Sequence, residues 1–435
     1  MAYYIGVVFS GLSGFKLPNL FLWTLVILAL FNSLNNTFQG WSSYHYYIGA
    51  KYFTELGYFD LYECTAVAPI ARRNLHDYSF RFDVPRCNAD FQDLNRVAEF
   101  RHDIFRSGFY NQALADKGYN GTPPLIAVNK FLINSHLINL NNFKMLDVIA
   151  LAVALVVLIW SVGWRKSAYI ALFILTYYGT IDRLWGHFSQ WLWLSSALVG
   201  VALLHKNKSW GAFWVGVSSA LAIFPVFLML AYIKDKRAVG WSVIGLVFML
   251  WVGLFSGRGV AGYTEFLHNM TIHSNYIRTE LCCNIGLAHT VASSQNPDSD
   301  YLTCFNDSAL CREDYSNDFS VIYWLTLFPL VATSPLGAMF ALITLSRYYM
   351  LILAVIPVWY SERWAGRLQL LNTLSLIWFI RNPEQFFIYG DWLWFIFFLL
   401  LGVSNVIQVN TALMEFCKQG LYTALTVWRV RYRIR

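Results

Sequence analysis

The sequence predicts an all-α polytopic membrane protein, and three observations support this fold class. Of the 435 residues, 57% are hydrophobic, 18% are aromatic and only 13% are charged, whereas soluble domains carry roughly 25% charged residues. The mean hydropathy is +0.45. The apolar runs are long and unbroken, which favours helices over the alternating segments of a transmembrane barrel. This composition excludes a disordered chain and disfavours an ordinary soluble enzyme.

The first apolar run, at about residues 18–34, is predicted to be a retained signal anchor. Lys16 is the only early cation, and no small-residue cleavage site follows the run. Further apolar segments lie at about 146–163, 168–181, 187–204, 210–233, 238–256, 319–345, 348–360, 367–380 and 391–409. Together they predict about 9–11 transmembrane helices, although several segments are short for a bilayer core of about 30 Å.

Two long polar stretches interrupt the apolar series and are predicted to be exterior loops, at 35–143 and 257–318. The first contains helical stretches of its own, for example 43–56 and 90–106, which we expect to lie on the membrane surface. The C-terminal stretch 411–435 ends in four alternating arginines and predicts a basic amphipathic helix on an anionic membrane face. A frayed basic tail is the alternative.

The cysteines indicate which side of the membrane the loops occupy. Six of the seven lie in the two polar stretches, which predicts disulfides on an oxidising side. Their pairing stays open, since six cysteines allow 15 pairings. A zinc site is the competing interpretation, but no C-x-x-C pair has a matching second pair, and no ligand motif for a divalent metal is present. The six are Cys64, Cys87, Cys282, Cys283, Cys304 and Cys311.

Basic turns indicate which parts of the chain lie on the opposite side of the membrane. They lie at Arg165-Lys166, at 205–208 and at 234–237, and the positive-inside rule places all three in the cytoplasm. The last two flank one apolar segment of about 24 residues with Pro225 in its middle. A single crossing would separate them, so we predict a helix pair broken near Phe224-Pro225 within 210–233.

The net charge of +7 fits basic cytoplasmic loops. No basic stripe accompanies a nucleic-acid motif, so no nucleic-acid partner is expected.

The most distinctive local pattern opens the first loop, where aromatic residues recur from Tyr44 to Tyr62. One interpretation is an aromatic belt at the membrane interface. The other is a surface helix that shapes a cleft and presents a carboxylate to a hydroxyl acceptor.

Four motifs in order resemble the GT-C glycosyltransferases that use polyprenyl-phosphate sugars, in particular the bacterial branch related to polyprenol-phosphate-mannose mannosyltransferases. They cover residues 20–290. The motifs are Tyr46-Tyr47-x-Gly49-Ala50-Lys51-Tyr52, then Gly186-His187-Phe188-x-Gln190-Trp191-Leu192, then Gly211 and Gly216 with Ala220 and Phe224-Pro225, and last His273 followed by Asn284-x-Gly286-Leu287.

This resemblance implies a GT-C-like fold with a large first exterior loop and a lipid-linked sugar donor entering between helices. A carboxylate in that loop would deprotonate the acceptor hydroxyl, and a hexosyltransferase reaction with inversion would follow. The partners would be membrane lipids and the polyprenyl-phosphate sugar, with membrane-protein subunits as a further class. The location would be a bacterial inner membrane with loops in the periplasm, or the ER membrane in a eukaryote.

The sequence departs from the family where the base is expected, because residues 36–54 contain no Asp or Glu. Asp60 is the first candidate base because it follows the Gly57-Tyr58 turn. Asp182 is the second, since a charge at the exterior end of a span usually faces a cavity. Glu55 is a third candidate, and His45 could substitute as base.

Cations are needed for the anionic donor phosphate, and we expect Lys51, Arg183 and Arg258 to supply them. Interfacial snorkelling is the alternative for each. His273 is a substrate-binding candidate through the last motif.

Two other functions remain open. A non-catalytic membrane subunit on a GT-C-like scaffold would explain the missing early acid and the Ser189-Gln190 departure. A secondary transporter would explain a broken helix at Pro225, but no second broken segment and no internal repeat accompany it.

Overall fold

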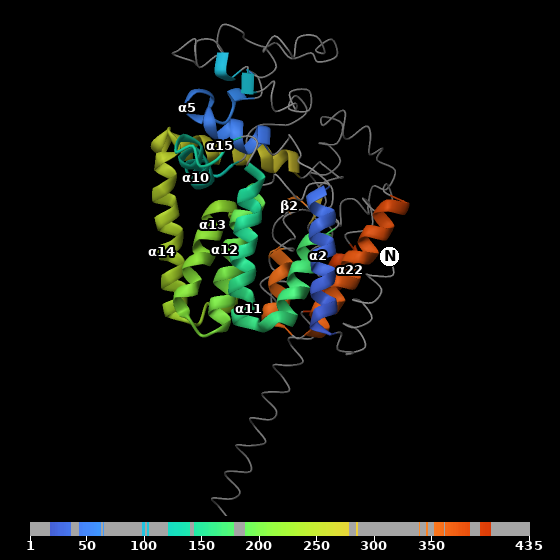
Figure 1. The fold of residues 1–435 in the computed structure, drawn as a ribbon. Coiled ribbons are helices and arrows are strands. Elements are labelled where there is room, and N and C mark those ends of the chain that lie inside the picture. The colour runs from blue at the N-terminus through green and yellow to red at the C-terminus, as the bar shows by residue number, and fades with distance from the viewer. Residues whose placement is uncertain are drawn as a thin grey trace, which may run out of the picture.

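The fold is given by a computed structural model, which describes part of the chain. The described residues are 18–35, 43–61, 64, 98–100, 102–103, 121–139, 143–177, 188–277, 284–285, 339, 345–346, 352–360, 362–382 and 392–401. They are predominantly helical (Figure 1), as the composition predicts. A two-residue antiparallel ladder joins β1 (Asn284–Ile285) to β2 (Leu345–Ser346).

Helix α11 (Phe143–Thr176) consists of two limbs that meet at Gly163. Gly163 has φ +84° and ψ 164°, a backbone conformation that is essentially confined to glycine. After this turn the second limb follows α22 (Glu362–Arg381). Lys166 donates to the carbonyl of Tyr360 just before α22, and Thr176 contacts Asn372 farther along it. The two limbs match the separate apolar segments predicted on either side of the Arg165-Lys166 turn.

Helix α2 (Asn19–Asn35) packs on the turn of α11. The Trp23 indole donates to the carbonyl of Trp164 at 3.2 Å, and the two rings meet edge to face with centroids 5.5 Å apart. This contact places the start of α2 at the same end of the bundle as Gly163.

The predicted break near Pro225 is present. After α12 (Phe188–His205), η4 (Ser209–Gly211) leads into α13 (Ala212–Ala222), which ends at Ile223 with φ +59° and is followed by the 3-10 helix η5 (Phe224–Tyr232). The hydroxyl of Ser209 donates to Asp235 at 3.2 Å. The start of α13 and the end of η5 therefore lie side by side, and the segment is a hairpin.

Close backbone approach joins α13 to α14 (Lys236–Gly253). A Cβ on Gly216 would lie 2.0 Å from the carbonyl oxygen of Ser242, and one on Gly245 would lie 2.1 Å from that of Phe213. Only glycine permits this contact, and small residues bring helices together in the same way within membranes. The Ser242 hydroxyl donates to Ala212 and contacts the Tyr232 hydroxyl, so α14 binds both limbs of the hairpin.

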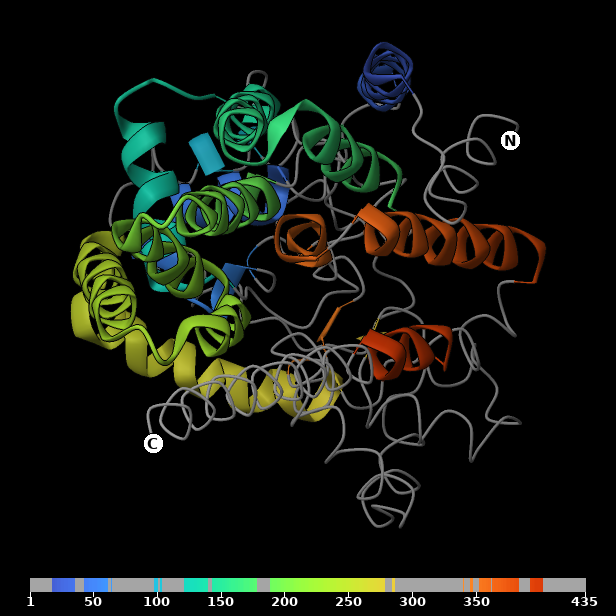
Figure 2. The same ribbon diagram turned by 90° about the horizontal axis from the view of Figure 1, so that it is seen from below.

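The basic turns gather at one end of the bundle, which we call the basic end (Figures 1 and 2). The Lys206 ammonium lies 5.8 Å from the ring centre of Trp160, at the base of the first α11 limb. Asp235 in the third turn meets Ser209 beside the second. This common placement is what the predicted topology requires.

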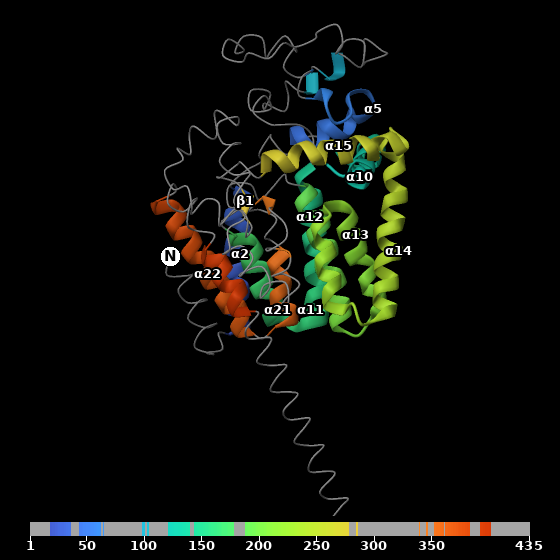
Figure 3. The same cartoon turned by 180° about the vertical axis from the view of Figure 1, so that it is seen from behind.

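Further helical segments cover the opposite end, which we call the cleft end after the cleft described below (Figures 1 and 3). They are η1 (Ser43–Ile48), α4 (Gly49–Lys51), α5 (Phe53–Leu56), α10 (Pro123–Asn134), η6 (Leu254–Ser256) and α15 (Gly259–Ile277). Helix α15 runs across this end rather than along the bundle (Figure 3). The Thr122 hydroxyl caps α10 by accepting from Leu125 N and donates to the carbonyl of Leu221 on α13.

A polar seam lies between the end of α11 and α22. Gln369 donates to the Thr176 hydroxyl at 3.1 Å, and Asn372 donates to the Thr176 carbonyl at 2.8 Å. The Asn372 amide thus satisfies the Thr176 carbonyl at the end of α11, which has no partner within its own helix, and the Gln369 amide holds the Thr176 side chain. Helix α21 (Ile356–Trp359) and the helical segment 392–401 complete this side.

Two helical stretches in the described part of the chain are long and apolar enough to cross a bilayer by length and composition, Leu146–Thr176 and Lys236–Ser256. The first of them contains the Gly163 turn. Shorter apolar helices occur at Asn19–Phe31, Trp191–His205 and Trp392–Leu401. The expected 9–11 spans and exterior loops stay predictions, and the tail 411–435 lies outside the described residues.

Candidate functional site

The aromatic run that opens the first predicted loop folds into the protein. Tyr52, Phe53 and Tyr58 are fully buried. The Phe53 and Tyr58 rings meet edge to face at 4.9 Å, and the Tyr58 hydroxyl donates to the carbonyl of Gly121 at 2.7 Å. Gly57 ends α5 with φ +58°. The segment therefore forms a packed aromatic floor at the cleft end, which favours the cleft interpretation over an exposed belt.

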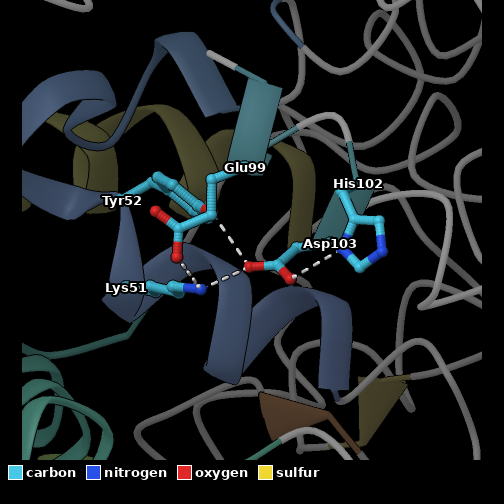
Figure 4. A network of polar contacts seen from close by, with 5 residues as sticks. All are labelled: Lys51, Tyr52, Glu99, His102 and Asp103. Atoms are coloured by element: carbon cyan, nitrogen blue, oxygen red, sulfur yellow. Dashed lines mark hydrogen bonds and ion pairs between the residues drawn. The ribbon is translucent and has the colours of Figure 1, made fainter. Parts of the chain in front are cut away.

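A network of hydrogen bonds and ion pairs adjoins the aromatic floor at Tyr52, with Lys51 at its centre (Figure 4). Its ammonium lies 2.6 Å from Asp103 Oδ2 and 2.7 Å from Glu99 Oε1, and the Tyr52 hydroxyl donates to Asp103 at 2.9 Å. Burial lowers the pKa of Lys51, but its hydrogen bonds to Asp103 and Glu99 outweigh burial and hold that pKa above its usual value. Lys51 is therefore a cation held by two carboxylates.

The two carboxylates differ in exposure. The side chain of Asp103 is 12% exposed, whereas that of Glu99 is 43% exposed. His102 approaches the other oxygen of Asp103 only at 3.9 Å and is itself exposed. Asp103 is thus the inner partner that holds Lys51, and Glu99 is the carboxylate that faces outward.

A half-open cleft of about 340 Å³ lies beside the network, which is within the size range of small-molecule sites. One wall comes from η1, α4 and Glu99, and the other from the end of α10 and the turn after it. The lining residues are Tyr47, Lys51, Glu99, Ile133, Asn134, His136, Ile138 and Asn139. An aromatic ring, two amides, an imidazole and a carboxylate suit a hydroxyl-rich ligand, because each polar group donates to or accepts from hydroxyls.

The charge of the cleft bears on what it can bind. Two carboxylates surround one ammonium, so this group carries a net negative charge. Such a charge disfavours a phosphate at Lys51, while Glu99 can accept a proton from a hydroxyl within about 3 Å. The predicted contact of Lys51 with a donor phosphate therefore stays a prediction, and the geometry holds its ammonium between two carboxylates.

Arg258 lies in a different contact, between the loop-one segment and α15. Its Nη1 is 2.6 Å from Glu265 Oε1, and its Nε and Nη2 donate to the carbonyls of Thr54 and Glu55. Gly57 allows this approach, since a Cβ there would lie 2.5 Å from Arg258 Nη1. Arg258 thus joins the end of α5 to α15, and the carboxylate of Glu265 balances its charge.

The other described candidates lie away from the cleft lining. Glu55 and Asp60 are half-buried on the loop-one segment, and neither lines the cleft. His45 is buried and packs edge to face on Tyr46 at 4.6 Å. Their catalytic roles stay predictions.

Several predicted residues fall outside what the structure describes. They are Asp182, Arg183, the side chain of His273, and Cys87, Cys282, Cys283, Cys304 and Cys311. Cys64 is buried and disulfide-bonded. The other six cysteines all lie outside the described residues, so the pairing stays open.

Sequence reasoning did not select Glu99, Asp103 or the α10 turn. Glu99 and Asp103 are four residues apart, in the stretch 90–106 expected to be helical, and this spacing places two carboxylates on one helix face. The four-residue spacing is therefore a local signal from which the carboxylate pair can be predicted. Asn134, His136 and Asn139 carry no local signal, because only the fold brings them opposite Lys51. No group of three metal-binding side chains occurs in the described part of the chain.

Comparisons with known proteins leave the family open. No protein-family model matches the sequence, no curated protein resembles it, and no solved structure matches its fold.

Proposed function

We propose that the chain is an integral membrane glycosyltransferase. It moves a sugar, mannose-like by resemblance, from a polyprenyl-phosphate donor to an acceptor hydroxyl at the cleft end. The acceptor occupies the cleft beside Tyr47, and Glu99 removes the proton from its attacking hydroxyl. Asp103 and Lys51 position Glu99.

The observation that carries this proposal is the Lys51–Glu99–Asp103 group at the wall of the cleft. It supplies a carboxylate from the first predicted loop, which the resemblance requires and the sequence lacks at its usual position. A general base needs hydrogen-bond reach to its substrate and access from solvent. Glu99 lines the cleft and its side chain is 43% exposed, whereas Asp103 is enclosed by Lys51 and Tyr52.

Membrane embedding is supported by the exposed apolar faces of the long helices. On α14, Val243, Ile244, Val247, Phe248 and Leu250 are exposed, and a soluble protein rarely exposes so continuous an apolar patch. Exposed tryptophans flank the faces, as at membrane interfaces. At the basic end they are Trp160, Trp164, Trp210, Trp214 and Trp241, and at the other end of α14 Trp251.

The test compares two carboxylate variants in sugar transfer. Purified protein in liposomes receives polyprenyl-phosphate mannose as donor and an alkyl mannoside as acceptor. We expect Glu99→Gln to lower kcat by about 10²–10⁴-fold, the usual contribution of a general base, while Asp60→Asn retains activity. Thermal unfolding of each variant controls for folding. Full activity of Glu99→Gln would contradict the assignment of the base.

A non-catalytic membrane subunit is the second candidate, and one observation favours it. Both described cations assigned to the donor phosphate, Lys51 and Arg258, are ion-paired with carboxylates. Absence of transfer by the wild-type protein, together with purification at a fixed ratio with a larger complex, would support this alternative.

A further inference from the structure

A separate group of cationic side chains lies at the basic end, where the Gly163 turn of α11 meets the end of α12. We call this group the basic corner and define it as Trp160, Lys166, His205 and Lys206. The Lys206 ammonium lies 5.8 Å from the ring centre of Trp160. The Ser161 hydroxyl donates to the carbonyl of Ala202, so the two turns are held against each other.

The basic corner concentrates positive charge. Burial, followed by the charges of Lys166 and Lys206, lowers the pKa of His205, in keeping with the position of this imidazole between the two basic turns. Lys206 and Lys208 are exposed and form no ion pair with any carboxylate that the structure describes. Asp235, in the next turn, is occupied by the α14 amides and Ser209.

An apolar surface leads away from the basic corner. Ile149, Val153, Val156 and Trp160 are all more than half exposed and recur at helical spacing on the first limb of α11, so they form one stripe. The stripe is about 16 Å long at 1.5 Å per residue. Cations at one end of an exposed apolar stripe match the two parts of a phospholipid, a phosphate headgroup and its acyl chains.

We propose that the basic corner binds the headgroup phosphate of an anionic glycerophospholipid. Lys206 contacts the phosphate, Lys166 adds its charge from the Tyr360 carbonyl to which it donates, Trp160 lies at the level of the glycerol, and the acyl chains follow the α11 stripe. Basic pockets between helices on the cytoplasmic side bind anionic headgroups in this way. The inference rests on the membrane embedding proposed above and is independent of sugar transfer.

Native mass spectrometry of the detergent-solubilised full chain tests this site, with phosphatidylglycerol and phosphatidylcholine as probes. We expect phosphatidylglycerol to bind more tightly to the wild type, and Lys206→Gln to weaken its binding about fivefold, which corresponds to the ~1 kcal/mol that one lysine contributes near an anionic surface. The matched control is Lys234→Gln, which removes one exposed lysine from another turn of the same end. It should change binding less than twofold.

Three results would overturn the proposal. Equal binding of the two lipids would exclude anion recognition, and equal weakening by both substitutions would indicate a diffuse surface charge. Displacement of the lipid by millimolar inorganic phosphate would indicate a site for free anions. Sugar transfer is measured on the same samples, so a lost lipid preference with intact transfer overturns the lipid site alone.

Discussion

At the residue scale, Lys51 holds the two carboxylates at the wall of the cleft. This side chain is mostly buried and satisfies Asp103, which is enclosed by the aromatic floor. A buried carboxylate that loses its cation is costly. We therefore propose a positioning role for Lys51, which differs from the phosphate contact that the sequence predicts.

Replacement of Lys51 by methionine tests this role through its pH dependence. We expect Lys51→Met to lower the free energy of unfolding by about 1–3 kcal/mol near neutral pH, because Asp103 loses its partner. The folded pKa of Lys51 is raised, so its contribution is complete below about pH 10.4, the value in an unfolded chain, and disappears as pH rises through the folded pKa.

Thermal unfolding followed by tryptophan fluorescence measures the effect between pH 7 and 11.5. The difference between wild type and variant should be constant to about pH 10 and then shrink. Lys234→Met, which removes an exposed lysine, is the control. A loss no larger than that of the control, or one that persists unchanged at the highest pH, would contradict the account.

At the element scale, the α13–α14 contact determines how the broken hairpin is held. Gly216 and Gly245 bring two backbones together, and Ser242 joins α14 to both limbs. Pro225 and the positive φ of Ile223 prevent α13 from continuing. The hairpin is thus fixed by packing on α14 as well as by the break itself.

Two glycines of α14 provide a matched pair for this contact. We expect Gly245→Ala to destabilise the protein by about 1–3 kcal/mol, because the added Cβ overpacks the interface, 2.1 Å from the Phe213 carbonyl oxygen. Gly240 has open space at its Cβ position, so Gly240→Ala should be neutral or mildly stabilising. Thermal unfolding in detergent compares them. Equal effects of the two substitutions would show that the close approach does not stabilise the fold.

The sequence predicts these elements well where residues within the element itself determine its conformation. Pro225 and the basic turns on either side of it suffice to predict the hairpin, and Arg165-Lys166 suffices to separate the limbs of α11. The cleft depends on contacts far apart in the chain. Lys51 and Asp103 are separated by 52 positions, and the α10 turn is farther still, so no local pattern reveals them.

At the scale of the whole molecule, the functional groups are divided between two ends. Glu99 and the end of α10 line the cleft, and α10 lies at the end of the bundle opposite the basic turns (Figure 1). Apolar helix surfaces separate them. In the proposed membrane orientation, the proposed acceptor site and the proposed lipid site lie on opposite faces of the bilayer.

We propose that the bundle spans a membrane with the cleft outside and the basic end inside. Two single cysteine substitutions test this orientation in sealed vesicles that are uniformly outside-out. One is Asn139→Cys at the cleft wall, and the other is Asn207→Cys in an exposed basic turn. A membrane-impermeant maleimide should give extra labelling over wild type at position 139 in intact vesicles, and at position 207 only after detergent. Labelling of both positions from the same side of intact vesicles would contradict the account.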